Sequence, residues 1–392
     1  MNIGMNILVQ LSHPAHFHLY KNAIKNWQND GYNVHVLIKT KDILEELLQN
    51  SKIPCHNILP VAHRKNKLGV LWDMFVRDWK IYNFCKKHYI DILTGSTPEV
   101  AHVSKLLGLY SVNTGEDDMA VVPAFAKATG PFMQTLLSPI VCDNTPLEKH
   151  SVHYPSYHEL AYLHPNHFTA DKSIVDGYGI DTEKPYFILR FSSLNAHHDN
   201  GIQGINTEIA QRLVDTLAPH GQIYITSERE LEPQFEPYRI RINPLDMHHV
   251  MAFASLYIGD SQTMAAEAGV LGTPFVRFND FVGRIGYLRE LEDVYQLGYG
   301  IHATPLKEDS PIRLTNGQVQ PSGTEALYKA VEQLVAMPAD ERKALFAARR
   351  EKMLSEKIDY AKFLTWFIEN YPASQQETRE NQENADFWMQ FK

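Results

Sequence analysis

The sequence predicts an α/β protein of two doubly wound, Rossmann-like domains that face a cleft, with further helices at the C-terminus. Its 392 residues exceed what one hydrophobic core usually supports. Short apolar runs alternate with helical stretches in two successive series, the pattern of parallel sheets covered by helices. A segment rich in proline and aromatic residues, 145–168, separates the two series, and we interpret it as the interdomain connection.

The first series defines an N-terminal domain over residues 1–165. Its apolar runs predict strands at 6–11, 33–38, 91–94, 110–113 and 139–142. The stretches between them predict helices at 18–29, 42–50, 70–88, 99–107 and 118–128.

The second series defines a C-terminal domain over residues 166–356. It predicts strands at 186–191, 222–226, 256–258 and 275–278. Helices are expected at 207–218, 246–254, 263–271, 284–292, 325–336 and 339–356. A last helix within 357–372 could cross back to the N-terminal domain. The polar residues that follow predict a mobile tail over 373–392.

Composition and charge narrow the functional classes. The net charge of −9 offers phosphates no general attraction, so nucleic acid is not an expected partner. Three scattered cysteines and the lack of a signal-like N-terminus favour a cytoplasmic location. The stretch 68–79 carries Trp72, Phe75 and Trp79. An amphipathic helix packed on its own domain is the favoured interpretation, and peripheral contact with the inner face of a membrane stays open.

The most informative stretch, 256–278, reads as strand, turn, helix, turn and strand. Ser261 can cap the helix, whose first turn presents backbone N–H groups that suit a diphosphate. The side chains of Gln262 and Thr263 lie in the same turn. Glu267 sits in an otherwise small, apolar helix and needs a partner, for which two ribose hydroxyls would serve. The alternative is an ordinary cap, with Glu267 paired to a base such as Arg277 or Arg284.

This stretch resembles the D-S-G-G-x-x-E-E-A-x-x-L-G-x-P element of UDP-N-acetylglucosamine 2-epimerases and related GT-B glycosyltransferases. The matching residues are Ser261, Glu267, Ala268, Leu271, Gly272 and Pro274. The resemblance implies the GT-B architecture, with the N-terminal domain on the acceptor side. It also implies that Ser261 contacts the diphosphate and Glu267 the ribose. Gln262 and Thr263 stand where that family has two glycines.

Most of the chain is similar to an uncharacterised family of the same architecture, domain of unknown function 354. Five motifs carry this likeness: 13–16 (HPAH), 95–96 (GS), 157–163 (Y-x-ELAYL), 196–199 (A-x-HD) and 260–264 (DSQTM). They match as a set, which is more specific than any one of them.

Further candidates follow the first and third strands of the N-terminal domain. His13 and His16 could act as acid, base or hydrogen-bond donor near neutral pH, or be structural histidines. A zinc site is less favoured, because no cysteine or compact carboxylate cluster accompanies them. The Gly95-Ser96 turn is a candidate for binding the nucleotide sugar. It stands where the epimerases carry an acidic residue, and its lack of an acid counts against epimerisation.

Glu116 follows the next strand of that domain, in a run of three acidic residues. It falls where the epimerases carry a catalytic glutamate, although the glycine and arginine that should follow are missing. The alternative is that this acidic run simply stabilises the start of a helix.

In the C-terminal domain, Arg190 and Ser192 begin a turn that resembles the epimerase turn at the interdomain cleft. Arg190 could neutralise a diphosphate or serve a salt bridge. His198 and Asp199 could reach the acceptor or leaving group. In GT-B proteins, the loop that corresponds to Asn243 and Leu245 borders the base.

These features together predict a glycosyltransferase that uses a nucleoside-diphosphate sugar, with UDP as the expected nucleotide, in glycan or glycolipid assembly. No metal or other cofactor is expected. The acceptor, a glycan or a lipid-linked molecule, and the oligomeric state are left open. The alternatives are a UDP-sugar 2-epimerase and a non-catalytic protein that binds sugar nucleotides.

Overall fold

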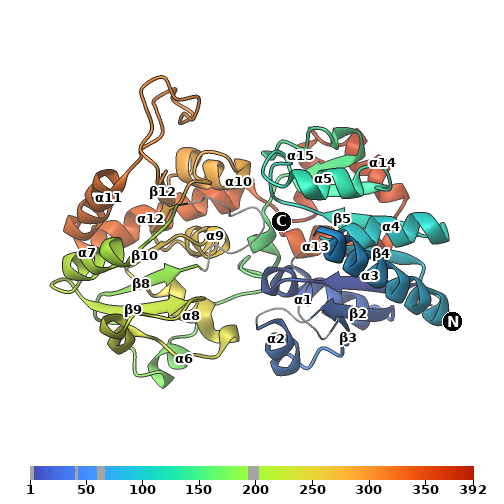
Figure 1. Cartoon of the computed structure of the whole chain (residues 1–392), viewed down its shortest axis with the longest axis horizontal. Helices are drawn as coiled ribbons and strands as arrows, with labels where there is room; N and C mark the ends of the chain where they lie inside the picture. The colour runs from blue at the N-terminus through green and yellow to red at the C-terminus, as the bar shows by residue number, and fades with distance from the viewer. Residues whose placement is uncertain (1–3, 40–42, 60–66, 193–202) are drawn as a thin grey trace. The chain divides into compact units, whose positions relative to one another are not determined.

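The structure is a computed structural model that describes residues 4–39, 43–59, 67–192 and 203–392. It divides into two compact units (Figure 1). Unit 1 comprises Met1–His167 and Lys357–Lys392, and unit 2 comprises Phe168–Glu356. The C-terminal segment of the chain therefore belongs to the same unit as the N-terminus.

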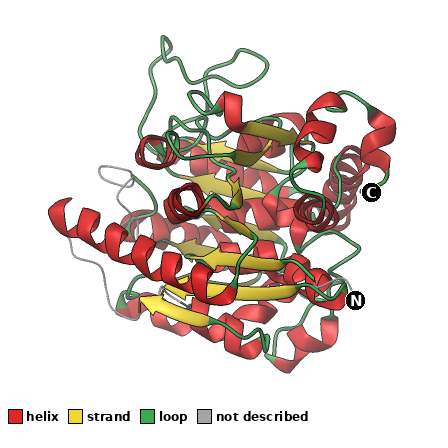
Figure 2. Ribbon diagram, turned by 90° about the vertical axis from the view of Figure 1, so that its right-hand side faces the viewer, coloured by secondary structure: helices red, strands yellow, loops and turns green. Residues whose placement is uncertain are grey.

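The described strands of unit 1 form one parallel sheet in the order β3-β2-β1-β4-β5-β6-β7 (Figure 2). The strands are β1 Asn6–Leu11, β2 Asn33–Lys39, β3 His56–Leu59, β4 Ile92–Gly95, β5 Tyr110–Thr114, β6 Thr135–Pro139 and β7 Ser151–Tyr154. The chain adds strands on one side of β1 and then on the other. The strand order therefore reverses between β1 and β4.

Helices cover both faces of this sheet. They are α1 Pro14–Asn29, α2 Leu44–Asn50, α3 Lys67–His88, α4 Pro98–Leu107, α5 Pro123–Thr129, α13 Tyr360–Glu369, α14 Ala373–Glu380 and α15 Ala385–Met389. Two short 3-10 helices, η1 Glu148–His150 and η2 His158–Ala161, flank β7. The closing helix α13 lies on α1, where Trp27 Nε1 donates to the carbonyl of Thr365 at 3.3 Å.

Two expectations for the β6–β7 side of the unit 1 sheet were wrong. Segment 145–168 does not simply connect the units, because it contributes β7 to the edge of the sheet and η2 to the same unit. The strand expected at 139–142 lies instead at Thr135–Pro139, where it pairs with both β5 and β7. The strand pairing in the sheet, rather than the apolar run, fixed this position.

The prediction of a mobile tail over 373–392 is also wrong. Residues 373–392 contain α14 and α15, and the side chains of Phe387, Trp388 and Phe391 are buried. The rings of Trp388 and Phe391 lie 5.5 and 5.2 Å from that of Phe363 on α13. Three aromatic residues at the end of the chain supply the apolar area that the polar stretch before them lacks.

Unit 2 contains a second parallel sheet, in the order β12-β11-β10-β8-β9 among the described residues. Its strands are β8 Tyr186–Phe191, β9 Gln222–Ser227, β10 Leu256–Gly259, β11 Phe275–Phe278 and β12 Gly298–Ile301. Its helices are α6 Lys172–Gly177, α7 Thr207–Leu217, α8 Met247–Ala252, α9 Gln262–Leu271, α10 Gly286–Arg289, α11 Thr324–Ala336 and α12 Ala339–Glu356. The shorter elements are η3 Pro233–Tyr238, η4 Pro244–Asp246 and the π-helix η5 Glu290–Val294.

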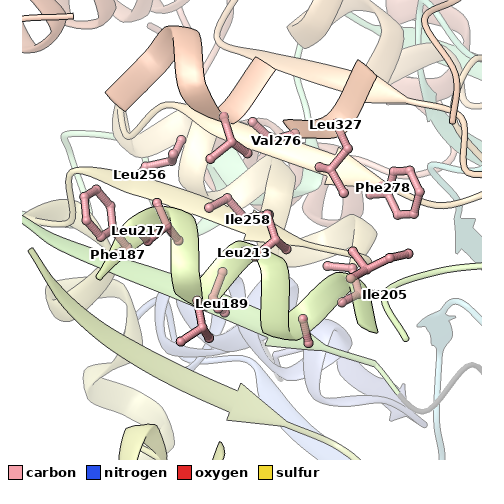
Figure 3. Packing of buried hydrophobic residues seen from close by; sticks show 14 of the residues in the cluster. Phe187, Leu189, Ile205, Leu213, Leu217, Leu256, Ile258, Val276, Phe278 and Leu327 are labelled. Atoms are coloured by element: carbon pink, nitrogen blue, oxygen red, sulfur yellow. The ribbon is translucent and has the colours of Figure 1, made fainter. Parts of the chain in front are cut away.

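One face of this sheet packs against α7 and α11. Figure 3 shows Leu213 and Leu217 of α7 lying over Leu256 and Ile258 of β10, with Leu327 of α11 nearby. The opposite face carries α8 and α9. Because side chains alternate along a strand, β11 directs Val276 and Phe278 to the α7 face and its other residues to the α9 face.

The edge strand β12, with the sequence GYGI, was not expected from the sequence. Close packing requires the two glycines of this strand. A Cβ at Gly298 would lie 2.4 Å from the ring of Phe275. A Cβ at Gly300 would meet the carboxylate of Glu292 at the same distance. A run this poor in β-branched residues gives little strand signal.

Candidate functional site

Each sheet reverses its strand order at one point, between β1 and β4 in unit 1 and between β8 and β10 in unit 2. Open parallel sheets bind ligands outside the carboxyl ends of the strands at such points. The candidate residues His13, Ser96 and Glu116 follow β1, β4 and β5, which are neighbours. Arg190 and Ser261 stand at the ends of β8 and β10, which also pair directly.

In unit 2, Ser261 caps α9 as the sequence predicted. Its backbone is extended, and its Oγ accepts from the N–H of Met264 at 3.5 Å. Gln262 and Thr263 form the first turn of the helix, where backbone N–H groups have no carbonyl partner within the helix. The partial positive charge of this ten-residue helix therefore points out of the sheet beside the switch point.

Asp260 fixes the loop that approaches this helix start. Its Oδ1 accepts from the N–H of Ser192 at 2.7 Å and its Oδ2 from the N–H of Ile205 at 3.3 Å. Burial raises the pKa of Asp260 to about 6, although these hydrogen bonds favour the ionised form. Ser192 is thus placed next to α9 through its backbone, a role that the sequence did not reveal.

The carboxylate of Glu267 is buried and lies 3.0 Å from Nε2 of His248 on α8. The expected alternative, a pair with Arg277 or Arg284, is wrong. Arg277 makes a bidentate pair with Glu292 at 2.8 and 3.1 Å, and Arg284 is exposed. His248 was missed as a site residue, because only the packing of α8 on α9 brings it to Glu267.

Arg190 lies beside Gly259 in the paired strands, next to the start of α9. Its guanidinium donates to Thr226 Oγ1 at 3.0 Å and forms an ion pair with Glu228. Within the described part of the chain, its Nε is buried without a hydrogen-bond partner. The arginine is therefore held in place by β9 while one donor is not used.

Asn243 and Leu245 lie in the turn that precedes α8. Asn243 Oδ1 accepts from the N–H of Leu245 at 3.0 Å, and the Asn243 N–H donates to the Tyr178 hydroxyl at 3.0 Å. That hydroxyl donates to Asp246 at 2.7 Å. The turn thus fixes the start of the helix that carries His248. His198 and Asp199 lie outside the described residues.

In unit 1, His13 caps α1 with Nδ1, which accepts from the N–H of Ala15 at 3.2 Å. His16 Nδ1 lies 3.3 Å from both the N–H and the Oγ of Ser12. The two rings are 6.0 Å apart between centroids. Because Nδ1 of His13 accepts from the N–H of Ala15, the proton of the neutral ring lies on Nε2.

The Gly95-Ser96 turn ends β4. Gly95 has φ of +152°, and a Cβ there would lie 2.6 Å from the carbonyl oxygen of Gln10. Ser96 Oγ lies 2.7 Å from Thr114 Oγ1, which is also 3.2 Å from the Tyr20 hydroxyl. Close approach of β1 requires the glycine, and the serine joins a row of hydroxyl groups at the edge of the sheet.

Glu116 lies in a cluster that the sequence did not predict. Its Oε1 accepts from the backbone N–H of His158 at 2.8 Å, and its Oε2 lies 3.3 Å from Nδ1 of the same residue. The carboxyl of Glu159, which is 1% exposed, hydrogen-bonds to Glu116. The ring of His158 stacks on Tyr360 from the C-terminal segment at 5.5 Å between centroids.

Burial controls the protonation of this cluster. Desolvation, and then the neighbouring charge of Glu159, raises the pKa of Glu116 well above its usual value. Desolvation lowers the pKa of the His158 imidazole to about 3. Glu116 and His158 therefore both favour their neutral forms. Among the described residues, Nε2 of His158 is buried without a hydrogen-bond partner. A proton donor and a proton acceptor thus lie side by side.

His158 gives a prediction for acid stability. A base with a depressed folded pKa stabilises the protein above its unfolded pKa and loses that stabilisation as pH falls toward the folded value. The window runs from the ordinary 6.5 down to about 3. Between pH 7 and pH 5 the loss from His158 should be about 2 kcal/mol.

The measurement is urea unfolding of the wild type and of His158→Gln at both pH values. The wild type should lose about 2 kcal/mol more than the variant on acidification. An equal loss in the two proteins would show that His158 is not buried in its neutral form.

No group of three or more histidine, cysteine or acidic side chains within the described ranges is arranged to hold a metal ion.

Solved structures of similar fold cover nearly the whole chain. The UDP-GlcNAc 2-epimerase from Neisseria meningitidis bound to UDP-GlcNAc has a TM-score of 0.61 and 11% identity, over 93% of this chain and 99% of that chain. The MnaA–UDP structure from S. aureus has a TM-score of 0.62 and 10% identity, over 95% and 97%. The spinosyn rhamnosyltransferase SpnG complexed with spinosyn aglycone has a TM-score of 0.54 and 13% identity, over 92% and 99%. No curated protein matches the sequence.

Two parallel sheets flanked by helices, with neighbours of this kind, define an α/β protein of the GT-B fold. At 10–13% identity these neighbours show the fold alone. Residues 5–281 match the family described as "Protein of unknown function (DUF354)". The chain belongs to that family.

Proposed function

We propose that the protein is a glycosyltransferase that uses a nucleoside-diphosphate sugar, with UDP as the nucleotide. The observation that carries this proposal is the constellation on α9 of unit 2. Ser261 caps the helix at the switch point of the sheet, and the buried carboxylate of Glu267 follows on the same helix. The helix start suits a diphosphate, and a carboxylate is a bidentate acceptor for two ribose hydroxyls.

The neighbouring residues support this assignment. Arg190 supplies a fixed positive charge beside the helix start and has an unused Nε donor. Its ion pair with Glu228 holds the side chain in place, which lowers the entropy lost when a ligand binds. His248 orients the carboxylate of Glu267 from α8. Binding at this site then uses side chains and helix N–H groups, and needs no metal ion.

The acidic cluster of unit 1 is the proposed source of acid and base catalysis. Transfer of a sugar to a hydroxyl requires a group that takes the hydroxyl proton. The raised pKa of Glu116 makes this carboxyl the proposed group for proton exchange, while His158, whose pKa is lowered to about 3, stays neutral beside it. The unidentified acceptor, a glycan or a lipid-linked molecule, would present its hydroxyl to this cluster.

The first test is a calorimetric comparison of UDP, GDP, CDP and TDP binding to the purified protein. We expect UDP to bind most tightly, with no requirement for a divalent ion. UDP release from UDP-sugars is then measured against a panel of glycan and lipid-linked acceptors. No binding of any of the four nucleotides would refute the proposal.

Replacing Glu267 by glutamine should weaken UDP binding. The amide keeps the shape of the side chain and can still accept from His248, but it loses the charge-assisted bonds to the ribose. The expected loss of affinity is about 1–3 kcal/mol, or roughly 5-fold to 150-fold. Calorimetry with UDP measures it, with exposed Glu332→Gln as the control. Unchanged affinity in Glu267→Gln would exclude the ribose contact.

A UDP-sugar 2-epimerase is the second candidate, and one observation favours it. The sequence argued against epimerisation because the Gly95-Ser96 turn lacks an acid. The structure brings Glu159 next to Glu116, so a second carboxyl is present in the cluster after all. Incubation of UDP-sugars without acceptor separates the two candidates. Conversion of the sugar itself would establish the epimerase, and UDP release that depends on an acceptor would establish the transferase.

A further inference from the structure

The outward side of α3 presents an aromatic face, which we define as Trp72, Phe75 and Trp79. These side chains are 54%, 59% and 60% exposed. They are spaced three and four residues apart, so they lie on one side of the helix. The rings of Trp72 and Phe75 are 5.9 Å apart between centroids. Single exposed apolar residues need no explanation, whereas a contiguous apolar patch of this size is often functional.

The inward side of α3 is firmly attached to unit 1. Arg77 pairs with Glu99 of α4, and Asp78 Oδ2 lies 3.0 Å from Nδ1 of His102 on the same helix. Ile81 and Cys85 are buried in the core of the unit. The α4 helix runs beside α3 (Figure 1). The helix therefore cannot turn its aromatic face inward without breaking these contacts.

Exposed lysines lie further along the helix, with Lys86 on the same side as the aromatic face and Lys87 beside it. Lys86 follows Trp79 by two helical turns, Lys87 is next to it, and both are exposed. The chain as a whole carries a net charge of −9, so this local positive charge is not a property of the general surface. Helices that lie in a membrane interface typically combine two features. Their aromatic rings enter the interface, and their lysines contact the anionic headgroups.

The area of the aromatic face argues against a second copy of the chain as its occupant. At roughly 200 Å² for each aromatic side chain, the exposed portions sum to about 350 Å². A stable dimer buries about 800 Å² on each partner. Insertion into a bilayer interface needs no matching protein surface, and tryptophan is enriched at that depth.

We propose that α3 docks unit 1 on the surface of an anionic bilayer, with Trp72, Phe75 and Trp79 in the interface and Lys86 and Lys87 against the headgroups. None of the described helices is long and apolar enough to cross a membrane, so the contact is peripheral. The docking proposal goes beyond the proposed function and does not depend on it. If the protein is a transferase, docking would bring the enzyme to lipid-linked acceptors.

The test is co-sedimentation of the full chain with vesicles, in the absence of nucleotide. One set of vesicles is phosphatidylcholine alone, and the other is phosphatidylcholine and phosphatidylglycerol in equal parts. We expect the wild type to pellet with the anionic vesicles, and less so as salt is raised. The triple variant Trp72→Ser, Phe75→Ser and Trp79→Ser should lose at least about tenfold in partitioning.

Two further variants make the result specific. Lys86→Gln with Lys87→Gln should remove most of the preference for anionic vesicles. Tyr299→Ser, which changes a 39% exposed aromatic residue of unit 2, should pellet like the wild type. The thermal midpoint of each variant is measured to check that the fold is intact. We expect midpoints close to that of the wild type, because the changed side chains are exposed.

Three outcomes would overturn the docking proposal: a wild type that stays in the supernatant with both vesicles, a triple variant that pellets like the wild type, or a wild type that is a dimer in gel filtration where the triple variant is a monomer. The last would assign the aromatic face to a second copy. UDP affinity, measured separately, distinguishes a failure here from a failure of the proposed function.

Discussion

Replacing Arg277 by methionine is expected to destabilise the protein by about 3–5 kcal/mol. Arg277 is 0% exposed in β11, where it forms two hydrogen bonds to the carboxylate of Glu292. The substitution leaves that carboxylate buried without its cation. Glu292 is also packed against Gly300, so it cannot move toward the sheet without a clash. Urea unfolding of the wild type and of Arg277→Met measures the loss.

The pH dependence of this loss follows from Glu292. Burial raises the pKa of Glu292 even with Arg277 beside it. A raised carboxyl pKa gives stability that is present at low pH and is lost as pH rises through the folded pKa. Removing Arg277 raises that pKa further. The destabilisation should therefore be larger at pH 7 than at pH 5.

Two comparisons make the first prediction specific. The double variant Arg277→Met with Glu292→Leu removes both charges and should recover most of the lost stability. Arg284→Met removes an exposed arginine of the same unit and should change stability by less than about 0.5 kcal/mol. If the double variant is no more stable than Arg277→Met alone, the loss comes from altered packing and not from an unpaired charge.

Replacing Glu116 by glutamine should lower kcat by about 10²-fold to 10⁴-fold. Burial and the charge of Glu159 raise the pKa of Glu116 and so favour its neutral form, which the amide matches in shape and charge. It can still accept from the backbone N–H of His158, but it cannot exchange a proton. We therefore expect turnover to fall while stability and UDP affinity stay near wild-type values.

The assay is UDP release with an acceptor, or sugar conversion without one, whichever the wild type performs. Glu148→Gln is the matched control, because this glutamate is exposed and bonds to His153 in the same unit. Its kcat should equal that of the wild type. A kcat for Glu116→Gln within a few-fold of the wild type would remove Glu116 from the chemistry.

The alternating series of the sequence predicted the fold well where each strand is apolar and buried on both sides. β1, β8 and β11 begin and end at the expected residues. β3, β7 and β12 were missed, because edge strands are short and need not be apolar on both faces. The π-helix at Glu290–Val294 stands where a regular helix was expected, and it carries Glu292 toward Arg277.

Local sequence also determined the start of α9. The cap at Ser261 and the turn before it depend only on residues a few positions apart. A local sequence pattern is therefore enough to predict them. The partner of Glu267 did not follow in the same way. Spacing along the chain allowed Glu267 to pair with an arginine. The packing of α8 on α9 makes His248 its partner instead. A buried carboxylate requires a partner, and the tertiary structure determines which residue that partner is.

By itself the sequence determined the two doubly wound units, the positions of most strands along the chain and the presence of Glu116 at the end of β5. Tertiary structure alone decided what surrounds that residue. Glu116, His158 and Tyr360 come from three separate parts of the chain, and the last belongs to the returning C-terminal segment. Protonation depends on desolvation and on charges close in space. These properties arise only when distant segments pack together, so no local pattern in the sequence could have revealed them.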